Sequence, residues 1–161
     1  MKSSAFGFKE VSKHFQNIKA LDGISLDIPL NSIFGLLGPN GSGKSTLMRI
    51  LAGLIQSWDG TLNVGGKIRT SGNNEHLKDF GFLIEAPSFY EYLSAFDNLK
   101  ILSRLMDINT KSINKVLETV NLTDRANDKV KTYSYGMKQR LGLAQCLLHD
   151  PQVLILDEPN N

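Results

Sequence analysis

Residues suited to binding phosphate are concentrated in one short segment of this 161-residue chain. Segment 38–46, called the phosphate loop below, reads G-P-N-G-S-G-K-S-T and matches the pattern G-x-x-x-x-G-K-[ST]. Its glycines, Gly38, Gly41 and Gly43, permit the positive φ angles that turn successive backbone N–H groups toward an anion. The spacing therefore predicts a cradle for the phosphates of a nucleotide.

Two elements must position this loop, an apolar run before it and a helix after it. Residues 33–37 (I-F-G-L-L) predict a short buried parallel strand, and residues 45–54 predict the helix. The N-terminus of that helix adds its dipole to the anion site. In this setting Lys44 would reach the β- and γ-phosphates, and the Ser45 hydroxyl would hold Mg²⁺. The alternative, an ordinary glycine-rich turn, does not account for strand, lysine and helix together.

A second candidate site lies near the end of the sequence, where the apolar run 153–156 (V-L-I-L) is followed by Asp157 and Glu158. A buried strand ending in two acids places one carboxylate near a metal ion and the next near a water molecule. Asp157 would hold Mg²⁺ through its water shell, and Glu158 would act as the general base. Two acids after a strand are often only solvated loop residues, so this interpretation depends on the motif's place in the chain.

Composition sets broader bounds. A chain of 161 residues with a net charge of +2 suits one domain and shows no general nucleic-acid footprint. No apolar stretch reaches the roughly 18–20 residues that span a bilayer, and the N-terminus lacks a signal-peptide core, which favours a cytosolic protein. Cys146 is the only cysteine and is expected in the core, while the three histidines lack ligand spacing.

Periodicity predicts the remaining elements. Strands are expected at 5–11, 21–28 and 80–84, with a hairpin around Gly65-Gly66 joining 61–64 to 67–69. Amphipathic helices are expected after a capping-box-like start at Ser94, around 113–120, and over 135–149. The order is strands, phosphate loop, strands, a helical insert and a return to the sheet.

This order resembles the ATP-binding subunit of an ATP-binding cassette (ABC) transporter over essentially the whole chain. Residues 133–140 (Y-S-Y-G-M-K-Q-R) look like a variant of the L-S-G-G-Q signature that keeps Ser134 and Gly136, and 153–158 looks like the Walker B motif. Ser134 can cap the helix that follows, leaving its N-terminus for an anion. In the family this anion is the γ-phosphate of ATP held by a second subunit.

The resemblance implies an α/β fold, a RecA-like P-loop NTPase of the ABC-cassette type with a helical subdomain insert and with the C-terminal part of the core missing. It implies a single incomplete ATP-binding domain over 1–161, divided into core 1–85, insert 86–134, and signature helix with Walker B strand 135–161. ATP and Mg²⁺ are the implied ligands, with Glu158 catalytic and Ser45, Glu85 and Asp157 at the metal. The implied nucleotide-binding residues are Phe15, Gly38, Pro39, Asn40, Gly41, Ser42, Gly43, Lys44, Ser45, Thr46, Ser134 and Gly136.

Two of these positions carry open alternatives. Phe15 would stack on adenine, although a core phenylalanine is the other reading. Glu85 stands where most of the family has glutamine, and I-E-A-P-S-F-Y-E-Y-L resembles the bacitracin- and lantibiotic-resistance exporters. The aromatic residues that follow, Phe89, Tyr90 and Tyr92, would either contact a membrane subunit or pack the insert.

The implied activity is ATP hydrolysis by a complete, paired protein, which powers export through separate membrane-spanning permease subunits from the cytoplasmic face of the membrane. A nucleotide-binding module without turnover and a soluble non-transport ABC ATPase are the alternatives. Family members continue past Glu158 with a strand that carries a histidine, so we expect a fragment whose central sheet lacks one strand. Such a chain should not hydrolyse ATP by itself, and 33–37 should not pair directly with 153–156.

Overall fold

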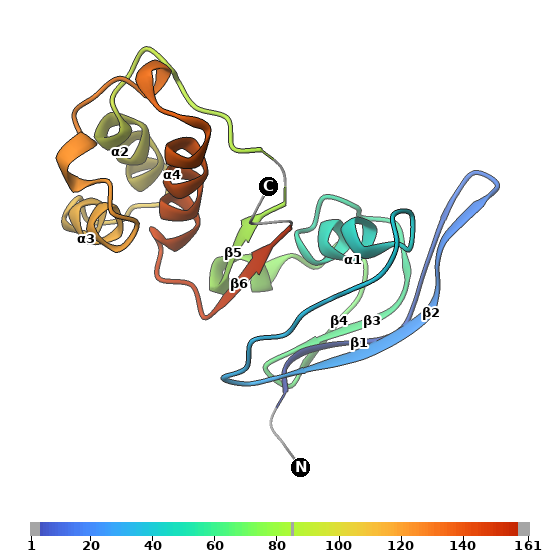
Figure 1. Cartoon of the computed structure of the whole chain (residues 1–161). Helices are drawn as coiled ribbons and strands as arrows, with labels where there is room; N and C mark the ends of the chain where they lie inside the picture. Colours follow the sequence, from blue (N-terminus) through green and yellow to red (C-terminus); the bar gives the residue numbers. More distant parts are fainter. Residues whose placement is uncertain (1–3, 85, 158–161) are drawn as a thin grey trace. The chain divides into compact units, whose positions relative to one another are not determined.

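The computed structural model describes residues 4–84 and 86–157, and the chain divides into two compact units, Met1–Leu77 and Lys78–Asn161 (Figure 1). The first unit contains the phosphate loop and a mainly antiparallel sheet. The second contains the helical insert, the signature segment and the strand before Asp157. Each unit has a hydrophobic core of its own.

The sheet of the first unit has four antiparallel strands in the order β2-β1-β3-β4. Their bounds are β1 Ser4–Phe15, β2 Ile18–Pro29, β3 Asp59–Val64 and β4 Lys67–Arg69. The predicted hairpin is confirmed: Val64 pairs with Lys67 across Gly65 and Gly66, whose φ angles are 55° and 82°. Two consecutive positive φ angles are what a tight two-residue turn between twisted strands requires.

One helix, α1 Lys44–Leu51, follows the phosphate loop and lies over a face of this sheet (Figure 1). It ends three residues before the predicted end at position 54. Its buried side chains are Leu47, Ile50 and Leu51, which have the spacing of one helical face. The buried residues of the sheet strands include Phe6, Phe8, Val11, Leu21, Ile28 and Leu62.

The predicted strand at 33–37 is wrong. Residues 32–39 have no regular secondary structure, and the Leu37 side chain is 92% exposed. Ile33, Phe34 and Leu36 are also exposed. A strand exists only where a neighbouring strand accepts its backbone hydrogen bonds, and no described strand of the first unit pairs with this segment. Its backbone and apolar side chains therefore face water in the structure.

The second unit combines three helices with a two-stranded parallel sheet. The helices are α2 Ala95–Leu105, α3 Lys111–Thr119 and α4 Tyr135–Leu147, and the strands are β5 Phe80–Leu83 and β6 Val153–Leu156. Short 3₁₀ turns are η1 Glu75–Asp79, which crosses the unit boundary, η2 Thr123–Arg125 and η3 Val130–Thr132.

The predicted helices and the strands at 80–84 and 153–156 are confirmed within a few residues. The Ser94 hydroxyl accepts a hydrogen bond from the Asp97 N–H, so α2 begins at its predicted cap. Leu99 of α2, Ile113 and Leu117 of α3, and Leu141 of α4 are buried together in one cluster. The helical insert is thus held by apolar side chains at helical spacing.

None of the helices in the described part of the chain is both long enough and apolar enough to cross a membrane.

Candidate nucleotide-binding site

The backbone of the phosphate loop has the positive φ angles expected of two of its glycines. Gly41 has a φ of 80° and Gly43 a φ of 91°. The third expectation is wrong, because Gly38 does not have a positive φ. A Cβ atom at Gly38 would instead lie 2.9 Å from the Ser42 Oγ atom, a close approach within the loop that rotation of the Ser42 side chain would relieve.

Gly43 also sits against the neighbouring strand. A Cβ atom there would lie 2.7 Å from the Ala20 carbonyl oxygen and 2.7 Å from Leu21 Cδ2, both in β2. Gly43 is the N-cap of α1, and its carbonyl accepts the hydrogen bond from the Leu47 N–H at 2.9 Å. The end of the loop is therefore fixed by close backbone packing on β2 and by the first turn of the helix.

The Lys44 side chain folds back over the loop. Its Nζ atom donates to the Gly38 carbonyl at 2.8 Å and to the Pro39 carbonyl at 2.9 Å. The loop is further closed by the Ser42 N–H, which donates to the Pro39 carbonyl at 3.2 Å. A single cation thus lies beside the loop carbonyls, at the start of a helix whose first turn contains no acidic side chain. This combination favours an anion.

The C-terminal end of α1 is held by a residue that the sequence did not single out. His76 is only 2% exposed, and its Nε2 atom donates to the Leu51 carbonyl at 2.6 Å. That carbonyl lies in the last turn of α1 and has no partner within the helix by the ordinary hydrogen-bond pattern. A histidine 25 residues away could not be linked to this helix end from sequence spacing.

Phe15, the predicted adenine platform, ends β1 in the same unit as the phosphate loop. Its side chain is 43% exposed, which does not fit the alternative of a core phenylalanine. The Lys13 ammonium lies 4.9 Å from the centre of its ring, within the range of a cation–π contact. Lys13 is a second residue that the sequence reading missed.

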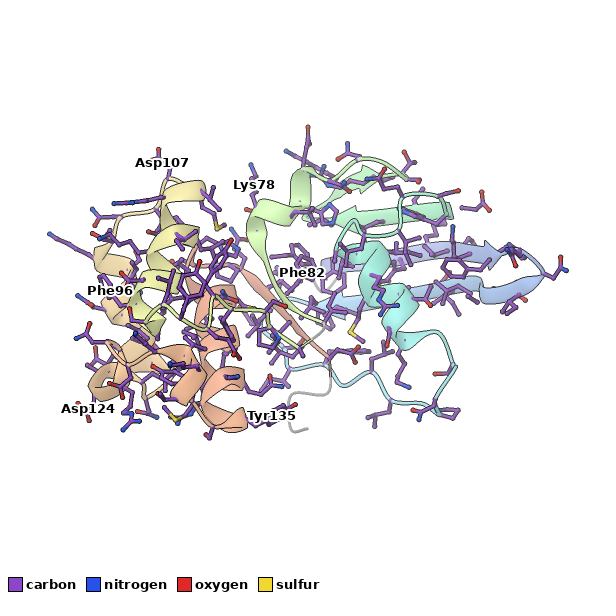
Figure 2. The ribbon with its side chains drawn as sticks, turned by 90° about the horizontal axis from the view of Figure 1, so that it is seen from above. Lys78, Phe82, Phe96, Asp107, Asp124 and Tyr135 are labelled. Carbon is purple, nitrogen blue, oxygen red and sulfur yellow. The ribbon has the colours of Figure 1, made fainter. Side chains whose placement is uncertain are left out.

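The signature segment forms the start of α4 in the second unit, where Tyr135 is marked in Figure 2. Ser134 caps the helix as predicted: its hydroxyl accepts from the Met137 N–H at 3.3 Å. A Cβ atom at Gly136 would meet nothing within 4 Å, so this glycine leaves open space beside the first turn. Tyr135 is exposed, and its hydroxyl accepts from Gln139 Nε2 at 2.8 Å.

Tyr133, just before the cap, is part of the hydrophobic core. Its ring is buried and its hydroxyl donates to the Arg125 carbonyl at 2.6 Å. Burial, with Asp128 as the next cause, raises the pKa of the Tyr133 hydroxyl. Tyr133, which stands where the L-S-G-G-Q signature has leucine, therefore still packs the segment into the core, and it adds a hydrogen bond.

Asp157 follows β6 at the end of the parallel pair. Its N–H donates to the Leu83 carbonyl at 2.8 Å, which extends the pairing of β5 and β6 by one residue, and its side chain is half-buried. Glu85 and Glu158 lie outside the described residues, so their predicted metal and catalytic roles stay predictions. Among residues 4–84 and 86–157, no group of three or more His, Cys, Asp or Glu side chains is arranged to hold a metal ion.

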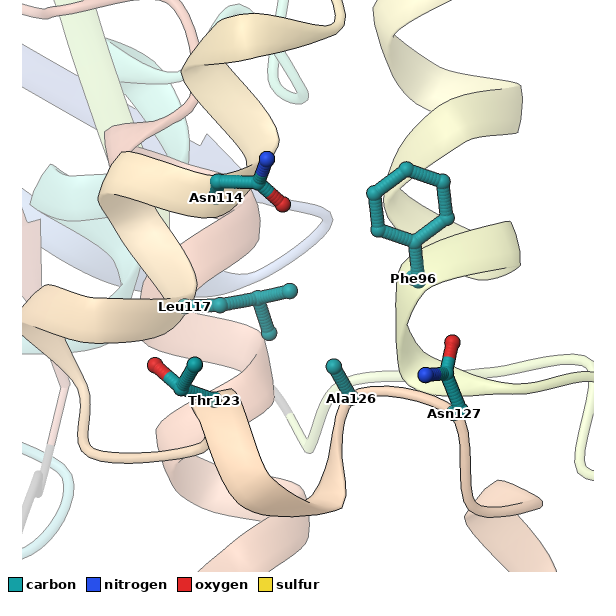
Figure 3. A pocket seen from close by; sticks show the side chains of 6 residues that line it. All are labelled: Phe96, Asn114, Leu117, Thr123, Ala126 and Asn127. Carbon is teal, nitrogen blue, oxygen red and sulfur yellow. The ribbon is translucent and has the colours of Figure 1, made fainter.

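A separate pocket of about 300 Å³ lies in the helical part of the second unit (Figure 3). Phe96 of α2 lies across it from Asn114 and Leu117 of α3, and the segment containing Ala126 and Asn127 closes one side. None of its lining residues belongs to the predicted nucleotide site. The three aromatic residues before α2 divide between the two alternatives: Phe89 is partly buried against the core cluster of the insert, whereas Tyr90 and Tyr92 are exposed, with ring centres 6.1 Å apart.

Comparison with known proteins supports the fold. The family model described as ABC transporter matches residues 21–161. A nucleotide-free ATP-binding cassette from an ABC transporter matches the fold with a TM-score of 0.86 and 20% sequence identity, covering 98% of this chain and 70% of that one. The ADP conformation of another cassette matches with a TM-score of 0.86 and 21% identity, covering 98% and 69%. The predicted fold class is confirmed.

The curated relatives are ATP-binding proteins. The uncharacterized ABC transporter ATP-binding protein YhcH of Bacillus subtilis is 47% identical, over 95% of this chain and 50% of its own length. The bacitracin transport ATP-binding protein BcrA of Bacillus licheniformis is 39% identical, over 94% and 50%. The lantibiotic transport ATP-binding protein SrtF of Streptococcus pyogenes is 37% identical, over 95% and 66%. The chain thus spans about half the length of the first two relatives.

Proposed function

Because this chain belongs to the ABC transporter family, we propose that it binds MgATP through the phosphate loop and forms part of an ATPase that drives export across a membrane. The observation that carries the proposal is the loop itself. Gly41 and Gly43 have positive φ angles, and the Lys44 ammonium lies 2.8 Å from a loop carbonyl at the start of α1. Phosphate oxygens would replace the Gly38 and Pro39 carbonyls as acceptors for this ammonium.

The rest of the nucleotide site follows from the same proposal. The backbone of 38–46 would hold the phosphates, and Phe15 would stack on adenine. Mg²⁺ prefers oxygen ligands, which the Ser45 hydroxyl, the half-buried Asp157 carboxylate and Glu85 offer. When bound, the metal would offset negative charge on the phosphates. Glu158 would take the proton from the attacking water.

The site needs a second subunit in this proposal. Ser134 caps α4, and Gly136 lies in its first turn with unfilled space beside it. A helix N-terminus of this kind suits an anion. We propose that this turn contacts the γ-phosphate bound by a second ATP-binding subunit, so that two nucleotides are held between two chains. Core 1–85, insert 86–134 and 135–161 would then act as parts of one ATP-binding domain.

The transported substrate class and the location are proposed from the relatives. Bacitracin and lantibiotic transport proteins share 37–39% of the aligned residues with this chain, which favours export of antimicrobial peptides through separate permease subunits at the cytoplasmic face of a membrane. The exposed pair Tyr90 and Tyr92 offers aromatic surface for such a permease contact.

Binding is tested by calorimetry with MgATP on the wild-type chain and on Lys44→Ala. Loss of the ammonium that faces the loop should weaken binding at least tenfold, which corresponds to about 1.4 kcal/mol. Lys67→Ala is the matched control, because Lys67 is an exposed lysine of the same unit, in β4. Equal affinities for the wild type and Lys44→Ala would contradict the phosphate-binding role.

Hydrolysis is tested separately by measuring phosphate release from a protein that spans the full length of the relatives. Glu158→Gln should keep MgATP binding and slow release by about 10²-fold or more, as expected for a lost general base. A wild-type protein that binds MgATP without releasing phosphate would support the alternative of a binding module without turnover.

A further inference from the structure

Lys13 and Phe15 form a paired unit at the end of β1. The Lys13 ammonium lies 4.9 Å from the centre of the Phe15 ring, and the same ammonium donates a hydrogen bond to the Ser57 carbonyl. Both contacts lie within the first unit. Lys13 is half-buried, whereas Phe15 is 43% exposed.

The second contact connects this pair to the segment that follows the phosphate-loop helix. Ser57 follows the end of α1 at Leu51 by six residues, before β3 begins at Asp59. The Lys13 ammonium therefore makes two contacts. It lies against the ring of the proposed base platform, and it donates a hydrogen bond to the segment after α1. A side chain with three donors on a flexible stem can make both contacts at once.

The contact has a geometric consequence for stacking. An aromatic ring has two faces, and a cation within about 6 Å of the ring centre occupies one of them. A base can then stack only on the other face. An exposed ring would otherwise lose rotamer freedom when a base binds, which weakens binding.

Resting on the proposed function, we infer that Lys13 is a positioning residue for the base of the nucleotide. It covers one face of Phe15 and holds the ring in place through Ser57, so that the other face is ready to stack on the purine. Lys13 acts through Phe15 and contacts neither the phosphates nor the metal.

The test compares a ligand with a base and one without. MgATP and magnesium tripolyphosphate are titrated into the wild type, Lys13→Met, Lys13→Arg and Phe15→Leu by calorimetry. Lys13→Met keeps the aliphatic stem and removes the cation, and it should weaken MgATP binding about two- to fivefold, the range of an exposed cation–π contact. The affinity of Lys13→Met for tripolyphosphate should equal that of the wild type. Lys13→Arg, which keeps a cation, should bind MgATP as the wild type does.

Coupling to the ring is measured in the Phe15→Leu background, where adding Lys13→Met should have no further effect on MgATP. Lys9→Met is the control, since Lys9 is an exposed lysine of the same strand. An equal loss of MgATP affinity with or without Phe15, or an equal loss for both ligands, would overturn the inference. Unchanged MgATP affinity in Lys13→Met would do the same.

Two further outcomes separate this inference from the proposed function. If the wild type binds MgATP and tripolyphosphate equally well, stacking of the base on Phe15 adds nothing to affinity. The inference then fails, while phosphate binding stands. If it binds neither, both fail. The contact itself is checked by NMR without nucleotide: the Lys13 ε-protons should be shifted upfield by the Phe15 ring, and Phe15→Leu should remove that shift. No such shift would overturn the inference.

Discussion

Replacing Gly43 by alanine tests whether close packing on β2 shapes the phosphate loop. Gly43 has a φ of 91° and a ψ of 1°, a conformation that L-residues other than glycine rarely adopt. The added Cβ atom would also lie 2.7 Å from the Ala20 carbonyl oxygen and 2.7 Å from Leu21 Cδ2. Leu21 is a buried core residue, and the Ala20 oxygen belongs to the backbone. Neither can move aside without disturbing β2.

The two effects add to a sizeable loss. The unfavourable φ costs on the order of 1–3 kcal/mol, and overpacking against a fixed neighbour adds about 1–3 kcal/mol. Gly43→Ala should therefore lower the free energy of unfolding by roughly 2–6 kcal/mol or push the loop away from β2. Displacement of the loop would move the Lys44 ammonium and the start of α1, so MgATP affinity should fall at least tenfold.

Gly72→Ala separates these two effects. Gly72 has a φ of 87°, close to that of Gly43, but an added Cβ atom there would meet nothing within 4 Å. Its substitution should cost only the backbone strain and leave MgATP affinity unchanged. Urea unfolding gives the stability of both variants, and calorimetry gives the affinity. If Gly43→Ala destabilises the chain no more than Gly72→Ala and binds MgATP normally, then contact with β2 does not hold the loop.

Two further predictions concern the second unit. Ser134→Ala should lower the free energy of unfolding by about 0.5–1 kcal/mol, toward the low end of N-cap effects, because the Ser134 hydroxyl lies 3.3 Å from the Met137 N–H. Ser94→Ala should cost more in the same urea titration, because it loses bonds of 3.0 Å to the Asp97 N–H and 2.6 Å to the Asp97 carboxylate. Burial raises the pKa of the Cys146 thiol from 9.0 to about 11, so its neutral form stabilises the fold fully below pH 9 and this contribution is lost as the pH approaches 11. Cys146→Ala should therefore show a shallower fall in unfolding free energy across this range, and an unchanged pH dependence would refute the assignment.

Local signals in the sequence predicted most of the elements that position the site. The Ser94 and Ser134 caps depend on residues within one turn of the helix, and the Gly65-Gly66 turn depends on two neighbouring φ angles. The phosphate loop is likewise specified by nine consecutive residues, 38–46. Such features are readable because the physical cause and the residue lie close together in the chain.

Contacts between distant residues could not be predicted in this way. His76 reaches Leu51 across 25 positions, and Lys13 reaches Ser57 across 44. Both depend on how β1, α1 and the η1 turn pack, which periodicity does not report. The sequence therefore identified residues expected to touch the nucleotide but missed those that hold the loop helix and the aromatic ring in place.

The error at 33–37 shows what supports the phosphate loop in this unit. An apolar run predicts burial, but a strand needs a hydrogen-bonding neighbour, and the described strands of the first unit leave these residues exposed. The loop nevertheless has its left-handed glycines, and its lysine lies across its own carbonyls. Its geometry must therefore come from Gly43 against β2, from the buried face of α1, and from His76 at the helix end. Substitutions at these three supports should disturb phosphate binding more than polar substitutions at the exposed Ile33 or Leu37.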